Sequence, residues 1–438
     1  MSEGLVRYRR IVLSSGTSIA VRGISIVTTL LSVPLVLNYL GEERYGLFVT
    51  VQSIVTLTYI LDLGMGNVVI NAVTSAATSD EAKPRLRTVI ASTFFTQAAA
   101  CGLVLALFLA VMPWLDLASF YGVKEAATRD EARNATVVFC VLLSFALPVS
   151  LVTRIQTGYQ ETYWVALGTG VANVLSLAAQ FACVKLHGTL TSFVAVTTLA
   201  PILVQIGTWV LVGARRPWVI PVLSQFERGQ VRTILRDSAG FLVMQIATLF
   251  AFTADNFVLT RMLDPVAVTH YAVPNRLFSA ITVFVNIAIN PFWPAFGDAQ
   301  ARGEFAWIKA ALLRGFVVAF ALSGGACFLV FLLFDQIIGL WLHDAFVADH
   351  GVVAALALWT TLGSSLYIFN IYLASVGKMT APAVVAVIMS ALALVLKIVL
   401  VRKIGVAGVV WATIIACVLV TLPGHALLVR RALNKVFA

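Results

Sequence analysis

Charged residues are scarce in this chain of 438 residues, since Asp, Glu, Lys and Arg together make up only 11%. Hydrophobic residues make up 60%, and the mean hydropathy is +0.95. A soluble domain carries about 25% charged residues, so this composition excludes an ordinary soluble protein. The longest polar stretches, about 113–133 and 214–237, are too short to bury a core. The composition therefore predicts an all-α polytopic membrane protein.

Catalytic and metal-binding patterns are also missing. The sequence has no Gly-x-x-x-x-Gly-Lys-Ser/Thr loop, no His-Glu-x-x-His and no Gly-x-Ser-x-Gly on a predicted strand. The five cysteines lie at scattered spacings inside apolar stretches, which is typical of helix packing rather than of disulfides or a metal site. They are Cys101, Cys140, Cys183, Cys327 and Cys417. We therefore expect no enzyme activity, no cofactor and no metal.

Positive charge exceeds negative charge, and the formal net charge is +10. No basic block with interleaved aromatic residues accompanies this excess, so nucleic acid is not an expected partner. Lys and Arg instead lie mostly in short loops, where they indicate membrane orientation.

Twelve apolar stretches are long enough to cross a hydrocarbon core of about 30 Å. The six predicted spans of the first half are 11–40, 46–77, 88–112, 134–158, 163–185 and 190–213. Those of the second half are 238–262, 268–297, 310–334, 350–376, 381–401 and 406–429. The first stretch is too long for a cleavable signal and lacks a small-x-small site. Loops on the side of the termini carry 17 Lys and Arg and those on the other side carry 8, which favours cytoplasmic termini.

A weak repeat relates the two halves of the chain. Gly158 and Gly188 flank one span, and Gly377 and Gly405 flank another, at offsets of 219 and 217 residues. Six spans separate the repeats, so the halves point the same way, as in transporters with a pseudo-two-fold axis along the membrane normal. We expect two six-helix lobes, 1–213 and 238–438, around a central cavity and joined by a cytoplasmic linker, 214–237.

Arg22 lies at membrane depth in the first span. An Arg at the bilayer centre costs about 2.5–3.5 kcal/mol on insertion scales, so it normally faces a bundle interior or a water-filled cavity. Several polar residues share its helical face. They are Ser14, Ser18, Ser25, Thr29 and Ser32. This face is predicted to be wet and basic, with the opposite face towards lipid.

The span 268–297 has a second polar face. Asn275, Ser279, Thr282, Asn286 and Asn290 recur at helical spacing, and Arg276 is adjacent. Arg276 lies about 12 Å, and Arg22 about 17 Å, from opposite ends of their spans. The two arginines are therefore predicted to reach similar depth, one in each half. Packing between helices is the alternative role for each amide.

Other polar residues in the spans suggest less specific roles. Asp62 follows Gln52, Thr56 and Tyr59, whereas Asp255 and Asn256 follow Gln245 and Thr248. Each aspartate is a candidate counter-ion to an arginine, a proton carrier or a helix-end residue facing water. Arg154 lies near a span end, where a binding role and snorkelling are both open. Lys397 and Arg314 are predicted to snorkel.

Four local motifs resemble one family. These are Leu-Gly-Glu-Glu-Arg-Tyr-Gly at 40–46, Leu-Asp-Leu-Gly at 61–64, Pro-Phe-Trp-Pro-Ala-Phe-Gly-Asp-Ala at 291–299 and Gly-Val-Ala-Gly-Val-Val-Trp-Ala at 405–412. They are similar to motifs of the Wzx-like polysaccharide transporters, the O-antigen flippases of the multidrug/oligosaccharidyl-lipid/polysaccharide exporter superfamily. The resemblance extends over essentially the whole chain.

This resemblance implies a flippase in the bacterial inner membrane with two lobes that open alternately. The implied substrate is an undecaprenyl-diphosphate-linked oligosaccharide for lipopolysaccharide or exopolysaccharide synthesis, moved to the periplasmic leaflet. Membrane lipids, a polysaccharide polymerase and a chain-length regulator are the implied partners. Arginine suits the diphosphate, and Asn, Ser and Thr suit sugar hydroxyls. The expected substrate contacts are Arg22, Arg154, Asn256, Asn275, Arg276, Asn286 and Asn290.

Two other functions remain open. A multidrug exporter of the same superfamily commonly uses a carboxylate in its first span, and 11–40 contains none. A cationic lumen would also repel cationic drugs. A membrane scaffold for polysaccharide assembly that does not transport is the third hypothesis. It predicts that Arg22 and Arg276 contact fixed partners rather than an accessible cavity.

Overall fold

The structure, a computed structural model, describes residues 3–57, 62, 64–76, 83–123, 126–236, 238, 254–342, 346–347, 349–375 and 380–434. All regular secondary structure within these ranges is helical. Ten of the described helical segments are long and apolar enough to cross a membrane. The chain is therefore an all-α multi-pass membrane protein, which confirms the predicted fold class.

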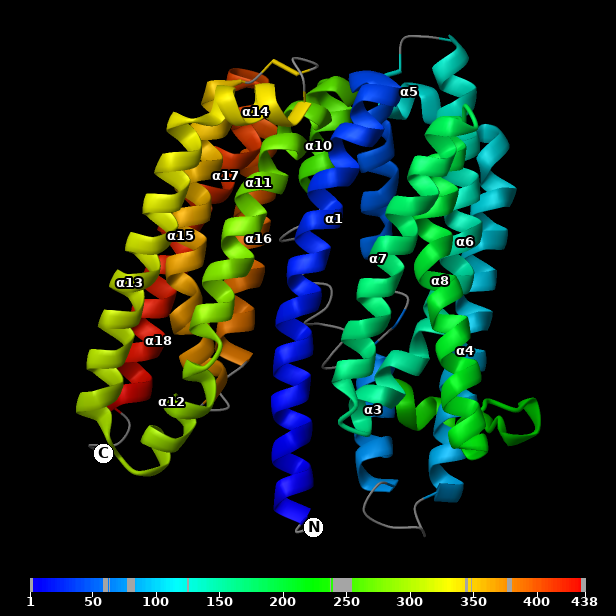
Figure 1. The fold of residues 1–438 in the computed structure, drawn as a ribbon, viewed down its shortest axis with the longest axis vertical. Helices are drawn as coiled ribbons and strands as arrows, with labels where there is room; N and C mark the ends of the chain where they lie inside the picture. The colour runs from blue at the N-terminus through cyan, green and yellow to red at the C-terminus, as the bar shows by residue number, and fades with distance from the viewer. Residues whose placement is uncertain are drawn as a thin grey trace. The chain divides into compact units, whose positions relative to one another are not determined.

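The chain divides into two compact units, Met1–Ile246 and Ala247–Ala438. Long helices build the first unit (Figure 1). They are α1 (Glu3–Ser53), α3 (Met65–Ala76), α4 (Lys83–Val111), α6 (Ala126–Gly158), α7 (Thr162–Lys185) and α8 (Leu190–Arg215), with the short α5 (Leu117–Tyr121). Short 3-10 turns occupy Ile54–Leu57, Met112–Trp114, Pro217–Val219 and Leu223–Gln225. The helix α7 packs against both α1 and α8.

The second unit is also built of helices (Figure 1). Its helices are α10 (Ala254–Met262), α11 (Pro265–Ile289), α12 (Phe292–Ala301), α13 (Phe305–Leu332), α14 (Phe334–Leu342), α15 (His350–Ser375), α16 (Thr380–Ile404), α17 (Ala407–Ala416) and α18 (Leu422–Asn434). A π-helical segment, Cys417–Thr421, joins the last two. As α1 packs against α7 in the first unit, α10 packs against α16 here.

Gly41 separates the first two predicted spans. Its φ of 78° and ψ of 170° interrupt α1, and only glycine adopts this region without strain. The candidate span Ala20–Ser53 therefore contains parts of two predicted spans. The predicted span 46–77 falls partly, and 238–262 largely, outside the described residues.

Proline changes the helix boundaries in two places. The span predicted over 268–297 is wrong as one helix, because α11 ends at Ile289 and Pro291 is the N-cap of α12. Proline lacks the N–H that a helix interior requires. Near the end of the chain, the π-helical turn Cys417–Thr421 precedes Pro423. A π-bulge of this kind accommodates a break in the regular hydrogen-bond ladder.

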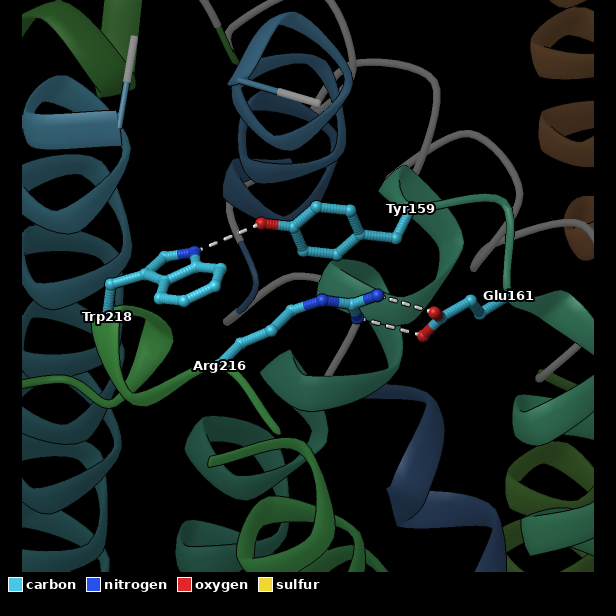
Figure 2. Close-up of polar contacts among 4 residues, drawn as sticks. All are labelled: Tyr159, Glu161, Arg216 and Trp218. Atoms are coloured by element: carbon cyan, nitrogen blue, oxygen red, sulfur yellow. Dashed lines mark hydrogen bonds and ion pairs between the residues drawn. The ribbon is translucent and has the colours of Figure 1, made fainter. Parts of the chain in front are cut away.

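The described part of the predicted linker, residues 214–236, packs on the first unit. Val219 and Ile234 are buried in its hydrophobic core. The Arg216 guanidinium donates to both carboxylate oxygens of Glu161, at 3.0 and 2.6 Å, and lies 4.0 Å from the centre of the Tyr159 ring (Figure 2). The hydrogen bonds with Glu161, more than any other contact, raise the pKa of Arg216 above its ordinary value. The boundary between the units falls after Ile246.

Corresponding positions of the two repeats carry buried polar residues. Gln180 on α7 lies eight residues before Gly188, and Lys397 on α16 lies eight residues before Gly405. Their exposed fractions are 3% and 1%. Each contacts the first described helix of its own unit. Ser32 on α1 donates a hydrogen bond to Gln180, and Asp255 on α10 forms an ion pair with Lys397. Both repeats thus have a polar contact at this position, which is a neutral hydrogen bond in the first unit and an ion pair in the second.

Candidate functional site

Polar side chains of α11 line a cavity of about 630 Å³ inside the second unit. Asn275, Ser279, Thr282 and Asn286 follow one another along one face of the helix, and all four border this space. Further hydroxyl, amide and imidazole groups come from α15 to α18. They are Thr360, Ser364, Tyr367, Asn370, Ser390, Thr413, Thr421 and His425. The helical spacing seen in the sequence therefore identifies one wall of a cavity, and that cavity lies within a single unit.

Asn290 and Asn256, also predicted to contact substrate, are not part of this lining among the described residues. The Asn290 Oδ1 accepts a hydrogen bond of 3.1 Å from the hydroxyl of Tyr367. Asn290 therefore positions a side chain that does face the cavity. Asn256 is half-buried on α10, where its carbonyl accepts from Thr260.

A buried ion pair lies at the cavity wall. The Lys397 Nζ is 2.5 Å from Asp255 Oδ1, and the Tyr271 hydroxyl donates to Asp255 Oδ2 at 2.8 Å. The lysine side chain is only 1% exposed and the aspartate side chain 17%. The prediction that Lys397 snorkels is wrong, because its ammonium group is held inside the unit by a carboxylate. The counter-ion of Asp255 is therefore Lys397 rather than an arginine. The two opposite charges cancel, so this pair adds no net charge to the cavity wall.

Apart from Asp255 Oδ1, which is paired with Lys397, three buried polar atoms of the lining have no hydrogen-bond partner among the described residues. They are Asn286 Oδ1, Ser364 Oγ and His425 Nδ1. The other ring nitrogen of His425 lies 3.1 Å from Asn370 Oδ1. A buried polar atom without a partner costs about 1–3 kcal/mol, so it is ordinarily matched by water or a ligand. These atoms suit a ligand rich in hydroxyl groups.

Arg276 follows Asn275 on α11 but is exposed and does not line the cavity among the described residues. Arg314 is an exposed residue of α13. In the first unit, Arg22 is exposed on α1. Neither Arg22 nor Arg276 forms an ion pair within the described part of the chain.

The polar face predicted around Arg22 is largely a helix contact. Asn173 Nδ2 donates to Ser25 Oγ at 2.7 Å, and Ser32 donates to Gln180 Oε1 at 2.6 Å. Gln180 also donates to Thr197 on α8 at 2.9 Å. Sequence reasoning missed Asn173 and Gln180, although each is an amide in an otherwise apolar span. The side chains of Ser14 and Ser18 lie outside the described set.

Asp62 and Arg154 both contact Gly66. Asp62 is 5% exposed and accepts from Gln97 Nε2 at 2.7 Å and from the Gly66 N–H at 3.3 Å. A Cβ on Gly66 would lie 2.8 Å from Arg154 Nε, so the half-buried arginine packs directly over this glycine. Of the five polar candidates beside the aspartates, only Gln52 has a described side chain. Those outside the described side chains are Thr56, Tyr59, Gln245 and Thr248.

No group of three or more His, Cys, Asp or Glu that could hold a metal occurs among the residues the structure describes. All five cysteines are unpaired. The polar groups that line the cavity are amides, hydroxyls, an imidazole and a paired carboxylate. Such groups can hydrogen-bond and orient a polar molecule.

Solved structures define the class of this fold. An inward-facing multidrug resistance MATE family transporter of the MOP superfamily matches with a TM-score of 0.77 and 15% identity, over 97% of this chain and 100% of that one. The lipid II flippase MurJ in an inward closed conformation matches with a TM-score of 0.71 and 15% identity, over 97% and 89%. A MOP superfamily transporter from Pyrococcus furiosus gives 0.61 and 15%, over 97% and 96%. The chain has the two-lobe fold of MOP superfamily transporters.

The family follows from the sequence match. The model of the polysaccharide biosynthesis protein family matches residues 11–300. The chain belongs to this family, which confirms the resemblance found in its motifs. No curated protein matches the sequence.

Proposed function

We propose that the chain is a flippase for an oligosaccharide linked to undecaprenyl diphosphate. It moves this lipid from the cytoplasmic to the periplasmic leaflet by alternating access, for the synthesis of a surface polysaccharide. Membership of the polysaccharide biosynthesis family and the fold of MOP superfamily transporters support this proposal. The bacterial inner membrane is the proposed location, and the excess of Lys and Arg supports cytoplasmic termini.

The observation that carries the proposal is the polar cavity between candidate membrane spans of the second unit. Its lining offers amide and hydroxyl groups, among them Asn275, Ser279 and Asn286, and it includes unpartnered acceptors. Sugars present many hydroxyl groups that would satisfy these atoms, whereas an apolar molecule would leave them without hydrogen bonds. A site built to hydrogen-bond a ligand discriminates strongly against one that lacks the matching groups. A glycan is therefore the ligand that fits best.

Arg22 and Arg276 are the proposed contacts for the diphosphate. Each is a permanently charged donor within a membrane span, and guanidinium binds phosphate oxygens through paired hydrogen bonds. Arg154 is a further candidate, although its packing over Gly66 beside Asp62 also supports a structural role. Asp62 and Asp255 are the proposed coupling or counter-ion groups.

A multidrug exporter is the first alternative. The MATE transporters among the structural neighbours are 15% identical, a likeness that extends to the fold alone. A cationic drug would need an uncompensated carboxylate, and Asp255 at the cavity wall is already neutralised by Lys397. This pairing favours an uncharged ligand portion, such as sugar rings, over a cation.

A scaffold that does not transport is the second alternative. Both hypotheses accommodate a polymerase and a chain-length regulator as partners, so partner binding does not separate them.

The test is export of polysaccharide in cells that depend on this chain. Arg22→Ala or Arg22→Glu should abolish export and leave lipid-linked oligosaccharide on the cytoplasmic leaflet while the protein remains in the membrane. Normal export by a normally abundant Arg22→Glu protein would refute the role of this arginine.

A further inference from the structure

A second pocket of the second unit is apolar and lies between α13, α15 and α18. Its volume is about 580 Å³. Phe316 on α13, Leu366 and Phe369 on α15, and Leu422 and Val429 on α18 form its walls. No acidic side chain occurs among the described residues that line it. The pocket is thus suited to a hydrocarbon chain.

Two cations lie at one end of this pocket. Lys309 is in the second turn of α13 and Arg430 is near the end of α18, and both are exposed lining residues. These two helix ends lie at the same end of the second unit (Figure 1). Lys309 precedes Phe316, and Arg430 follows Leu422, by seven and eight residues, so the apolar walls extend about 10–12 Å from the cations. Within the described chain neither cation forms an ion pair.

The pocket adjoins the polar cavity. Leu366 and His425 line both spaces, so these side chains form a shared wall. On one side of this wall are the hydroxyl and amide groups of the cavity, and on the other are aromatic and aliphatic side chains. The apolar pocket and the polar cavity therefore lie side by side within this single unit.

We propose that this pocket binds the phosphate-proximal part of a single-chain polyisoprenyl phosphate lipid, with the phosphate on Lys309 and Arg430 and the chain along Phe316 and Phe369. The proposal rests on the proposed function, which supplies a lipid of this class; the phosphate occupies Lys309 and Arg430 at a different step of its passage from the one in which it contacts Arg22 and Arg276. One pocket with one cationic mouth matches one chain per headgroup, whereas a glycerophospholipid brings two. Lipid and pocket are equally apolar, so hydrophobic burial gives little selectivity in a membrane. The two cations must therefore supply most of the preference.

The test is photo-crosslinking in nanodiscs of phosphatidylcholine. The probe is a polyisoprenyl phosphate with a diazirine in its chain, and labelled peptides are identified by mass spectrometry. We expect labels on the peptides that contain Phe316, Phe369 and Val429. Replacing both Lys309 and Arg430 with Ala should lower this labelling by roughly tenfold or more. Arg431→Ala is the matched control, because Arg431 is exposed on the same helix and does not line the pocket among the described residues.

A second pair of variants blocks the pocket without changing charge. Ala426 lines the pocket, so Ala426→Trp should abolish the labelling. Ala426→Leu, with a smaller added side chain, replaces it if Ala426→Trp does not fold, and should reduce the labelling. Leu427→Trp adds similar bulk at an exposed neighbouring position outside the lining and should label normally.

The outcomes separate this pocket from the function on which it rests. Strong labelling that survives Ala426→Trp and the double Ala variant would place the lipid elsewhere and overturn the pocket alone. Equal competition by unlabelled phosphatidylglycerol would overturn the single-chain lipid as its occupant. Wild-type protein that takes no specific label from the probe anywhere would count against the pocket and the flippase function together.

Discussion

Lys397 and Asp255 form an ion pair of 2.5 Å between α16 and α10, and the lysine side chain is 1% exposed. Tyr271 of α11 donates to the second carboxylate oxygen. Three helices of the second unit thus meet at one carboxylate. Removing two charges from water is costly, and such a pair persists only where good geometry and further hydrogen bonds compensate. The pair holds these helices in register beside the polar cavity.

The first prediction concerns this pair. Lys397→Met leaves a buried carboxylate without its cation and should lower the free energy of unfolding by about 3–5 kcal/mol. Adding Asp255→Asn removes the second charge and should recover most of the loss. Unfolding in detergent micelles measures both, with Lys403→Met, at an exposed position near the end of α16, as the control. A double variant no more stable than Lys397→Met would show that the charges do not depend on each other.

Asn286 provides a test of the cavity. Its Oδ1 is buried without a partner in the described chain, so Asn286→Ala should cost little stability. It should lower transport by about tenfold, the equivalent of one good hydrogen bond to the glycan. Phe284→Ala is the control, because Phe284 is 62% exposed on the same helix. Unchanged transport by the Asn286 variant, or an equal loss in the control, would remove this amide from the binding site.

Gly408 tests the close approach of α16 and α17. A Cβ there would lie 2.6 Å from the backbone carbon of Leu400, and neither backbone is free to move far. Gly408→Ala should therefore destabilise the protein by about 3 kcal/mol. Gly325→Ala, in the middle of α13 with open space around it, should be neutral or stabilising by up to about 1 kcal/mol. Equal melting temperatures for the two variants would contradict the packing.

The contact between Arg216 and Glu161 anchors the segment after α8 (Figure 2). Glu161→Gln should lower the free energy of unfolding by about 1 kcal/mol, with Glu227→Gln as a control on the same segment. Because the folded state raises the pKa of Arg216, the ion pair contributes its full stability below the pKa that this arginine has in the unfolded chain, and this contribution is lost only at far more alkaline pH, as the pH rises through the folded pKa. The effect of Glu161→Gln should then be constant from about pH 7 to about pH 9. Greater loss at the alkaline end would mean that Arg216 is not the group involved.

Much of the fold follows from the sequence because apolar length and helical spacing are local properties. The stripe from Asn275 to Asn286 is visible from its spacing alone, and the same side chains line the cavity. Pro291 also predicts the break between α11 and α12, because proline is not tolerated in a regular helix interior.

The parts that could not be predicted depend on contacts between distant segments. Distance from a span end suggests that Lys397 snorkels, but its orientation is decided by Asp255 on another helix. Ser25 and Ser32 share a face with Arg22, yet Asn173 and Gln180 of α7 turn that face into a helix contact. Helical periodicity predicts which residues share a polar face, but it does not predict which other helix, cavity or solvent this face contacts.

The central claim is tested most directly by transport in proteoliposomes. Purified protein is reconstituted with an undecaprenyl-diphosphate-linked oligosaccharide on the inner leaflet, and exposure of the glycan to an external lectin or glycosidase is followed over time. The account predicts exposure that is faster than in protein-free vesicles and that is lost in Arg22→Glu and Arg276→Ala proteins, which insert normally. Exposure no faster than in empty vesicles, or equal rates for the wild type and both arginine variants, would contradict it.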